Sequence, residues 1–266
     1  MLATAVVVIA VTLSVARLGP RLGGIIAGTP IVLGPAYFFM GREQSAAFVH
    51  SSAVSTLHAL TATLLYLITY VAVAGRLGAV ASVATAIAAW LVGAFVFSYV
   101  PGGVGWALIV YAALFLVATF VARLLRLPHP RVHTPTRWPD LLLRGTVAGI
   151  LVGVATTVGA RLGPQVSGTL TGFPVGFLVI ALTLHQRFGA PVSRATLSTA
   201  QRGMFSLIAF AATTALMAPV VGGEGVFYLA LASSVAVSAL LFGLSRMQMW
   251  ILERGEAPFS GEEHGK

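Results

Sequence analysis

Nine long apolar runs divide the chain, and Gly, Pro, Arg or polar residues separate them. The runs lie at residues 2–18, 22–40, 46–74, 78–99, 103–125, 140–160, 166–184, 192–219 and 225–252. A helix needs roughly 20 apolar residues to cross the hydrocarbon core of a bilayer. The pattern therefore predicts an all-α integral membrane protein with about nine transmembrane helices and almost no soluble part.

A sequence repeat divides these runs into two sets. Residues 16–20 and residues 160–164 both read Ala-Arg-Leu-Gly-Pro, at an offset of 144 residues. The same offset aligns three further identical pairs, which are Gly24 with Gly168, Gly28 with Gly172, and Pro30 with Pro174. Eight identities at one fixed offset indicate a duplication.

The duplication predicts the domain organisation. Residues 1–100 form a first four-helix repeat, residues 101–139 a linker helix and a basic cytoplasmic loop, residues 140–252 a second four-helix repeat, and residues 253–266 a polar cytoplasmic tail. Five crossings separate equivalent points of the two copies. The second repeat is therefore expected to run through the bilayer in the opposite direction, as an inverted copy.

The distribution of charge sets the expected orientation. With the N-terminus outside, fourteen of the sixteen basic residues face the cytoplasm, which agrees with the positive-inside rule. The repeat partners Arg17 and Arg161 then fall on opposite sides, as inverted copies require. We expect a multi-pass protein of the bacterial plasma (inner) membrane, with an outer N-terminus and a cytoplasmic C-terminus.

Composition narrows the class of function. The chain is 58% hydrophobic and only 9% charged, and its net charge of +9 lies in short clusters between apolar runs, so no nucleic-acid partner is expected. The absence of cysteine excludes disulfides and thiolate metal sites. No P-loop, HExxH, GxSxG or cofactor fingerprint is present. We therefore expect no enzyme, no ATP-driven transport by this chain, no metal and no cofactor.

Inverted repeats favour a secondary transporter, because halves that exchange conformations open a central site to each side in turn. We expect an exporter of a small-molecule substrate that works by alternating access, with protons as the candidate coupling ion. The alternative is a membrane scaffold or accessory subunit for envelope lipid or polymer synthesis, since duplication of a dual-topology dimer leaves the same symmetry without transport. The lipid bilayer is the other expected partner, and a homodimer is left open.

The second helix of each repeat is the leading candidate for the substrate site. The candidate binding residues are Gly24, Gly28, Thr29 and Pro30 in the first copy and Gly168, Gly172, Phe173 and Pro174 in the second. Proline removes a backbone donor and frees carbonyls that protein, water or ligand must satisfy at membrane depth. Paired interruptions of this kind point to a midplane site. The alternative interpretation is close helix packing through G-x-x-x-G.

Polar and ionisable residues follow in the third helix of each repeat. The offset pairs His50 with Arg194 and His58 with Arg202. Within each helix the two residues are spaced i, i+8, which places them near one helical face. Ionisable groups within a membrane are costly, so we expect His58, Arg202 and the neighbouring Ser198 to line the substrate passage. Alternatively, Arg194 and Arg202 extend into the headgroup layer.

Three residues are candidates for proton coupling: Glu43, His50 and His58. Histidine titrates near neutral pH and can therefore link solute movement to a proton gradient. Glu43 has an alternative role as the ion-pair partner of Arg42 at the outer surface.

The G-x3-G-x-P segment resembles that of the GlpM-like small membrane proteins, which are single four-helix units with a Gly- and Pro-containing second helix and a polar third. The resemblance lies in residues 167–174 and 195–200. It implies that the chain is a fused pair of such units. The overall plan also looks like that of the drug/metabolite transporters, whose small multidrug members use a glutamate in the first helix to export cations. Residues 2–18 contain no acid, which counts against export of cations by that route. The arginines and histidines of the third helices favour an anionic or neutral solute.

Overall fold

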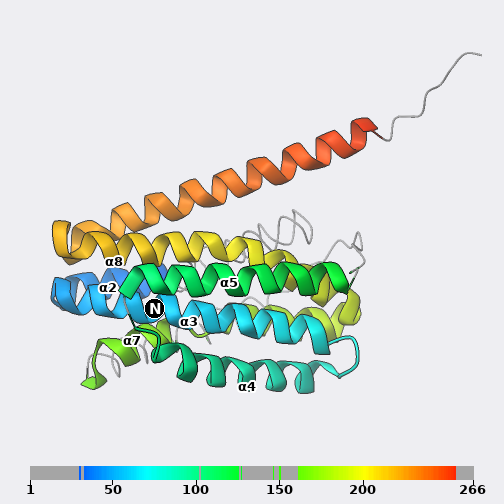
Figure 1. Ribbon diagram of the computed structural model, residues 1–266, viewed down its shortest axis with the longest axis horizontal. Helices are drawn as coiled ribbons and strands as arrows, with labels where there is room; N and C mark the ends of the chain where they lie inside the picture. The colour runs from blue at the N-terminus through cyan, green and yellow to red at the C-terminus, as the bar shows by residue number, and fades with distance from the viewer. Residues whose placement is uncertain are drawn as a thin grey trace, which may run out of the picture.

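The computed structural model describes residues 30, 33–101, 103–125, 127, 146, 150 and 161–255, with side chains described up to residue 247. Every regular element among them is a helix: α2 (Leu33–Glu43), α3 (Ala46–Val73), α4 (Ala79–Ser98), α5 (Gly103–Leu124), α7 (Pro164–Thr171) and α8 (Val175–Gly255) (Figure 1). The all-α prediction is confirmed for this part of the chain. The expected helices at 2–18 and 140–160, most of 22–40, and Gly24, Gly28 and Thr29 lie outside the described residues.

Four described stretches are long and apolar enough to cross a membrane. They are Ala46–Val73, Ala79–Ser98, Gly103–Leu124 and Pro164–Met247. Large apolar side chains of α4 and α5 face outward, including Phe95 (64% exposed) and Phe120 (67% exposed). So much exposed apolar surface is stable in lipid and not in water. The chain is therefore a membrane protein.

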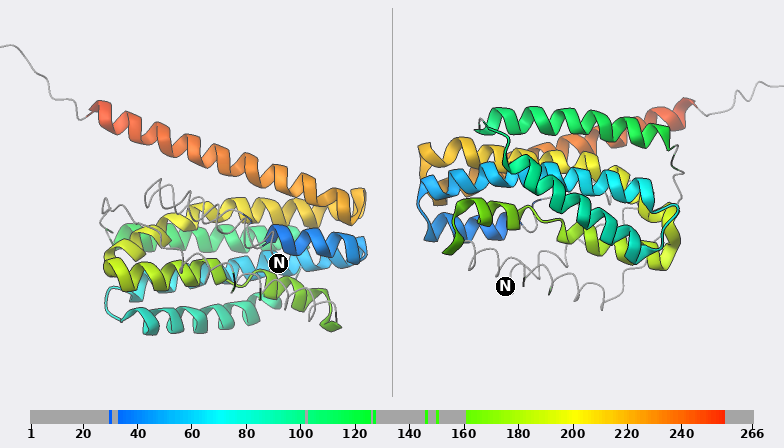
Figure 2. Two further views of the ribbon diagram at one scale, coloured as in Figure 1. Left: turned by 180° about the vertical axis from the view of Figure 1, so that it is seen from behind. Right: turned by 60° about the horizontal axis from the view of Figure 1, so that its bottom comes forward.

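The long α8 consists of three helical segments. Gly189 and Gly222 both have a φ of 80°, a left-handed conformation that glycine adopts without strain, and each interrupts the helix. We name the segments α8a (residues 175–188), α8b (residues 190–221) and α8c (residues 223–255). Their limits match the breaks expected after residues 184 and 219, and α8c leans away from the other helices (Figure 2).

Two pairs of helix breaks have the same spacing along the chain. Ser45 is the N-cap of α3 and Gly78 the N-cap of α4, 33 residues apart. Gly189 and Gly222 precede α8b and α8c and are also 33 residues apart. Both pairs of breaks are related by the offset of 144 residues found in the sequence repeat.

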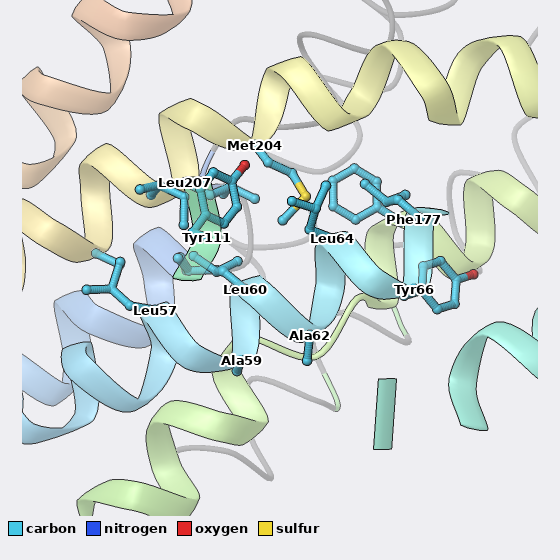
Figure 3. Packing of buried hydrophobic residues seen from close by; sticks show 14 of the residues in the cluster. Leu57, Ala59, Leu60, Ala62, Leu64, Tyr66, Tyr111, Phe177, Met204 and Leu207 are labelled. Carbon is cyan, nitrogen blue, oxygen red and sulfur yellow. The ribbon is translucent and has the colours of Figure 1, made fainter. Parts of the chain in front are cut away.

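Helix α3 is the centre of the bundle and packs along α8b (Figures 1 and 2). Figure 3 shows Leu60 and Leu64 of α3 meeting Met204 of α8b and Tyr111 of α5 in the buried core. We call the end at which α2 finishes and α3 begins the Gly41 end, and the opposite end, at which α3 finishes, the Gly75 end. The Gly222 kink lies at the first and the Gly189 kink at the second (Figure 1).

Candidate functional site

The break between α7 and α8a lies against α3. Helix α7 ends at Thr171, and α8a begins at Val175 after Gly172, Phe173 and Pro174. Pro174 has no backbone N–H, so it cannot continue the hydrogen-bonding pattern of α7. The run expected as one helix over 166–184 therefore consists of two pieces, as its Pro-containing sequence favours.

Two chains of hydrogen bonds satisfy carbonyls at this break. Thr56 Oγ1 donates to the Gly168 carbonyl (2.9 Å) and accepts from Tyr37 Oη (2.7 Å). Seven residues further along α3, Thr63 Oγ1 donates to the Gly172 carbonyl (2.8 Å) and accepts from Trp90 Nε1 (3.0 Å). The Gly168 carbonyl also accepts from the Gly172 amide (3.0 Å). At the Gly172 carbonyl, a hydroxyl of α3 takes the place that water or a ligand would otherwise fill.

The two glycines at this break are also closely packed. A Cβ atom at Gly168 would collide with the Ser52 carbonyl oxygen and the Ser55 side chain, and one at Gly172 would collide with the Ala59 side chain. The packing role that the sequence left as an alternative is therefore present here. The substrate-binding role of Gly168, Gly172, Phe173 and Pro174 stays a prediction. In the first copy, Pro30 is half-buried.

The candidate ionisable residues are spread along the bundle. His58 is buried in α3 (9% exposed), and its Nε2 has no hydrogen-bond partner among the described residues. Ser198 is half-buried in α8b, and Arg202 is exposed. The structure describes no contact that brings His58 and Arg202 together. Their assignment to a common passage stays a prediction.

The ends of α3 are tied to α8b by two matching contacts. His50 Nδ1 donates to the Ala215 carbonyl (2.6 Å), which lacks its usual helical donor because residue 219 is proline. Arg194 Nε donates to the Val71 carbonyl (2.8 Å), one of the last carbonyls of α3. Arg194, for which the sequence left a passage or a headgroup role open, thus caps a helix at the Gly75 end.

Glu43 is exposed at the end of α2. The expected alternative, an ion pair between Glu43 and Arg42, is wrong, because Arg42 Nε lies 3.0 Å from Glu224 Oε1. Arg42 and Glu224 line a small pocket of about 210 Å³ together with Phe38, Phe227 and Tyr228. No group of three potential metal ligands of the His, Cys, Asp or Glu type occurs within the described residues.

A hydrogen-bonded cluster at the Gly75 end was not foreseen. Tyr70 Oη lies 2.7 Å from Ser193 Oγ, 3.0 Å from His185 Nδ1 and 3.2 Å from the Ala181 carbonyl oxygen. Ser193 Oγ also donates to the Ala181 carbonyl (3.1 Å). The only signal in the sequence is a tyrosine within an apolar run, which gives no indication of partners more than 100 residues away.

Replacing Tyr70 by phenylalanine is expected to lower the free energy of unfolding by about 1–2 kcal/mol, because the buried Ser193 hydroxyl and the half-buried His185 ring each lose a hydrogen-bond partner. Equilibrium unfolding in detergent, followed by circular dichroism, measures the change. Tyr66→Phe is the matched control, since Tyr66 stacks on Tyr70 and its buried hydroxyl has no partner in the described part of the chain. Equal losses in both variants would contradict the role assigned to the Tyr70 hydroxyl.

Comparison of the chain with protein-family models, with curated proteins and with solved structures gives no match. The resemblance to GlpM-like units and to drug/metabolite transporters stays a prediction.

Proposed function

We propose that this protein is a secondary transporter that moves a small anionic or neutral solute by alternating access. In this proposal nine transmembrane helices form two inverted four-helix repeats joined by a linker helix. The N-terminus is outside, the C-terminus is cytoplasmic, and the membrane is the bacterial inner membrane. The proposed direction of transport is export, and the proposed coupling ion is the proton.

The observation that carries the proposal is the pair of contacts between α3 and α8b. His50 and Arg194 are related by the offset of 144, and so are their acceptors, Val71 and Ala215. Each donor near the start of one helix therefore contacts the acceptor near the end of the other. Reciprocal contacts of this kind are what a two-fold axis between two antiparallel copies produces. They support an inverted repeat independently of sequence identity.

Further features agree with the same axis. The Gly34 amide donates to the Pro30 carbonyl (2.7 Å), and at the same offset the Leu178 amide donates to the Pro174 carbonyl (2.8 Å). Helix α2 runs towards the Gly41 end, whereas its equivalent α8a runs towards the Gly75 end (Figure 2). Two structurally related halves in opposite orientations are the usual basis of alternating access.

The solute class follows from the charges of the central helices. Helices α3 and α7 and segments α8a and α8b contain no Asp or Glu. They contain three histidines and three arginines, which are His50, His58, His185, Arg187, Arg194 and Arg202. A passage between these helices would attract an anion or bind a neutral solute through hydroxyl groups, whereas a cation would find no counter-charge there.

Flux in proteoliposomes tests the proposal. The purified chain is reconstituted, and a panel of radiolabelled anionic and neutral metabolites is assayed with and without a pH gradient. We expect at least one solute to move and a pH gradient to change its rate. If no solute moves, and the chain instead co-purifies with a fixed biosynthetic partner, the scaffold alternative is correct.

His58→Gln and Arg202→Gln are expected to reduce the flux of that solute at least tenfold or to remove its pH dependence, while the protein remains folded. Both changes remove an ionisable group from the proposed passage and retain a polar side chain. Size-exclusion chromatography checks folding. Thr85→Val is the control, because Thr85 is exposed on α4 and bonds only to the Ala81 carbonyl of its own helix. If His58→Gln and Arg202→Gln both leave the flux unchanged, these two residues are not part of the substrate site.

A further inference from the structure

The Gly41 end is closed by direct contact between α2 and the first turn of α8c. The backbones of Gly41 and Gly223 touch, so a Cβ atom added to either would collide with the backbone of the other. Beside them, Arg42 pairs with Glu224, and its guanidinium lies 5.6 Å from the centre of the Phe38 ring. We call the Gly41–Gly223 contact and the Arg42–Glu224 pair the latch.

The backbone contact is the larger part of the latch. The side chains of Arg42 and Glu224 are 57% and 66% exposed, and ion pairs so open to solvent contribute at most about 1 kcal/mol. A methyl group at Gly41 or Gly223, in contrast, would force two chain segments apart, since the atoms in its way are backbone atoms. The phenyl rings of Phe38 and Phe227 meet edge to face next to this contact (5.3 Å) and extend the closed surface.

The equivalent positions at the Gly75 end have different chemistry. The offset of 144 relates the four latch residues to His185, Gln186, Ala79 and Val80. His185 and Ala79 have side chains, so the close backbone contact of two glycines is impossible between them. Gln186 and Val80 have no opposite charges and form no ion pair. His185 is instead hydrogen-bonded to Tyr70, and a Cβ atom at the neighbouring Gly78 would meet nothing within 4 Å.

We propose that the latch holds the protein closed at the Gly41 end and biases its resting state towards opening at the Gly75 end; this inference rests on the proposed alternating access. If the two inverted copies were identical in sequence, the state closed at the Gly41 end and the state closed at the Gly75 end would have equal free energies. The latch joins the two copies at the Gly41 end only and therefore breaks this equality. During each cycle it separates, and the segments around Ala79 and His185 approach one another.

Cross-linking of the reconstituted chain tests the bias without knowledge of the solute. The chain has no natural cysteine, so introduced pairs react without background. The pair Val80→Cys/Gln186→Cys reports closure of the Gly75 end with a short bismaleimide. Its reaction rate is compared in three backgrounds: unchanged, Glu224→Gln and Gly223→Ala.

We expect Glu224→Gln to raise the cross-linking rate by about two- to fivefold, the range that a pair worth up to 1 kcal/mol allows. Gly223→Ala should raise it further. Gly225→Ala is the matched control, because Gly225 lies in the same turn of α8c and its added Cβ would make only ordinary contact with Val221. A rate that is unchanged by both latch variants would overturn the inference.

The latch and the transport proposal fail separately. If cross-linking responds to the latch variants but no solute moves, the two-state latch is supported and transport is contradicted. If a solute moves but the cross-linking rate ignores the latch, transport stands and the latch is wrong. Gly223→Ala also perturbs backbone packing and can affect folding. The cross-linking rate of Glu224→Gln, which changes only an exposed side chain, is therefore the decisive comparison.

Discussion

Gly168→Val is expected to prevent the protein from folding, or to lower its free energy of unfolding by about 3 kcal/mol or more. The added side chain would enter the backbone of α3 at Ser52 and the side chain of Ser55. Separating α7 from α3 would also break the Thr56 hydrogen bond to the Gly168 carbonyl. Overpacking commonly costs 1–3 kcal/mol, and here a buried hydrogen bond is lost as well. Yield of monodisperse protein and unfolding in detergent measure the effect.

Gly176→Ala is the matched control for this prediction. Gly176 lies in the next helical piece, and a Cβ atom there would meet nothing within 4 Å. Alanine is the better helix former by about 1 kcal/mol, so the control is expected to be neutral or stabilising. If Gly168→Val is tolerated as well as Gly176→Ala, the close approach of α7 to α3 is incorrect.

Arg194→Met is expected to lower the free energy of unfolding by about 2–3 kcal/mol. The guanidinium forms a charge-assisted hydrogen bond to Val71 at the negative end of the α3 dipole and lies over Gly75. Methionine keeps much of the apolar length and removes the donor. Chemical denaturation in detergent measures the loss.

The comparison for Arg194 is Arg202→Met, since Arg202 is exposed eight residues further along α8b. Its replacement should change stability by less than about 0.5 kcal/mol. His50→Leu, the equivalent change at the other end, should also destabilise, because the Ala215 carbonyl would lose its donor. Equal effects of Arg194→Met and Arg202→Met would contradict the capping role of Arg194.

The sequence predicts the helices well where apolar runs are long and sharply bounded. Runs expected at 46–74, 78–99 and 103–125 correspond to α3, α4 and α5 within one residue at each end. Gly78 and Gly222 precede helices, and glycine adopts the non-helical backbone conformations of a helix break without steric strain. Helix boundaries of this kind depend on the local sequence and can therefore be predicted from one sequence alone.

The contacts of the site could not be predicted in the same way. Arg42 forms an ion pair with Glu224 and not with the adjacent Glu43, and Arg194 donates a hydrogen bond to the carbonyl of Val71. These contacts depend on how two helices that are distant in the sequence pack against each other. The periodicity of apolar residues does not predict that packing. The offset of 144 is the exception, since it relates His50 to Arg194 before their reciprocal contacts are known.

Equal spacing between helix breaks also determines how the protein responds to bilayer thickness. Helix α3 has 28 residues and is about 42 Å long, whereas the hydrocarbon core is about 30 Å thick. It must therefore tilt or extend into the headgroups. Because 33 residues separate the breaks that bound α3 and also those that bound α8b, a thicker or thinner bilayer strains α3 and α8b alike. Lipid chain length should then alter overall stability without favouring either open end.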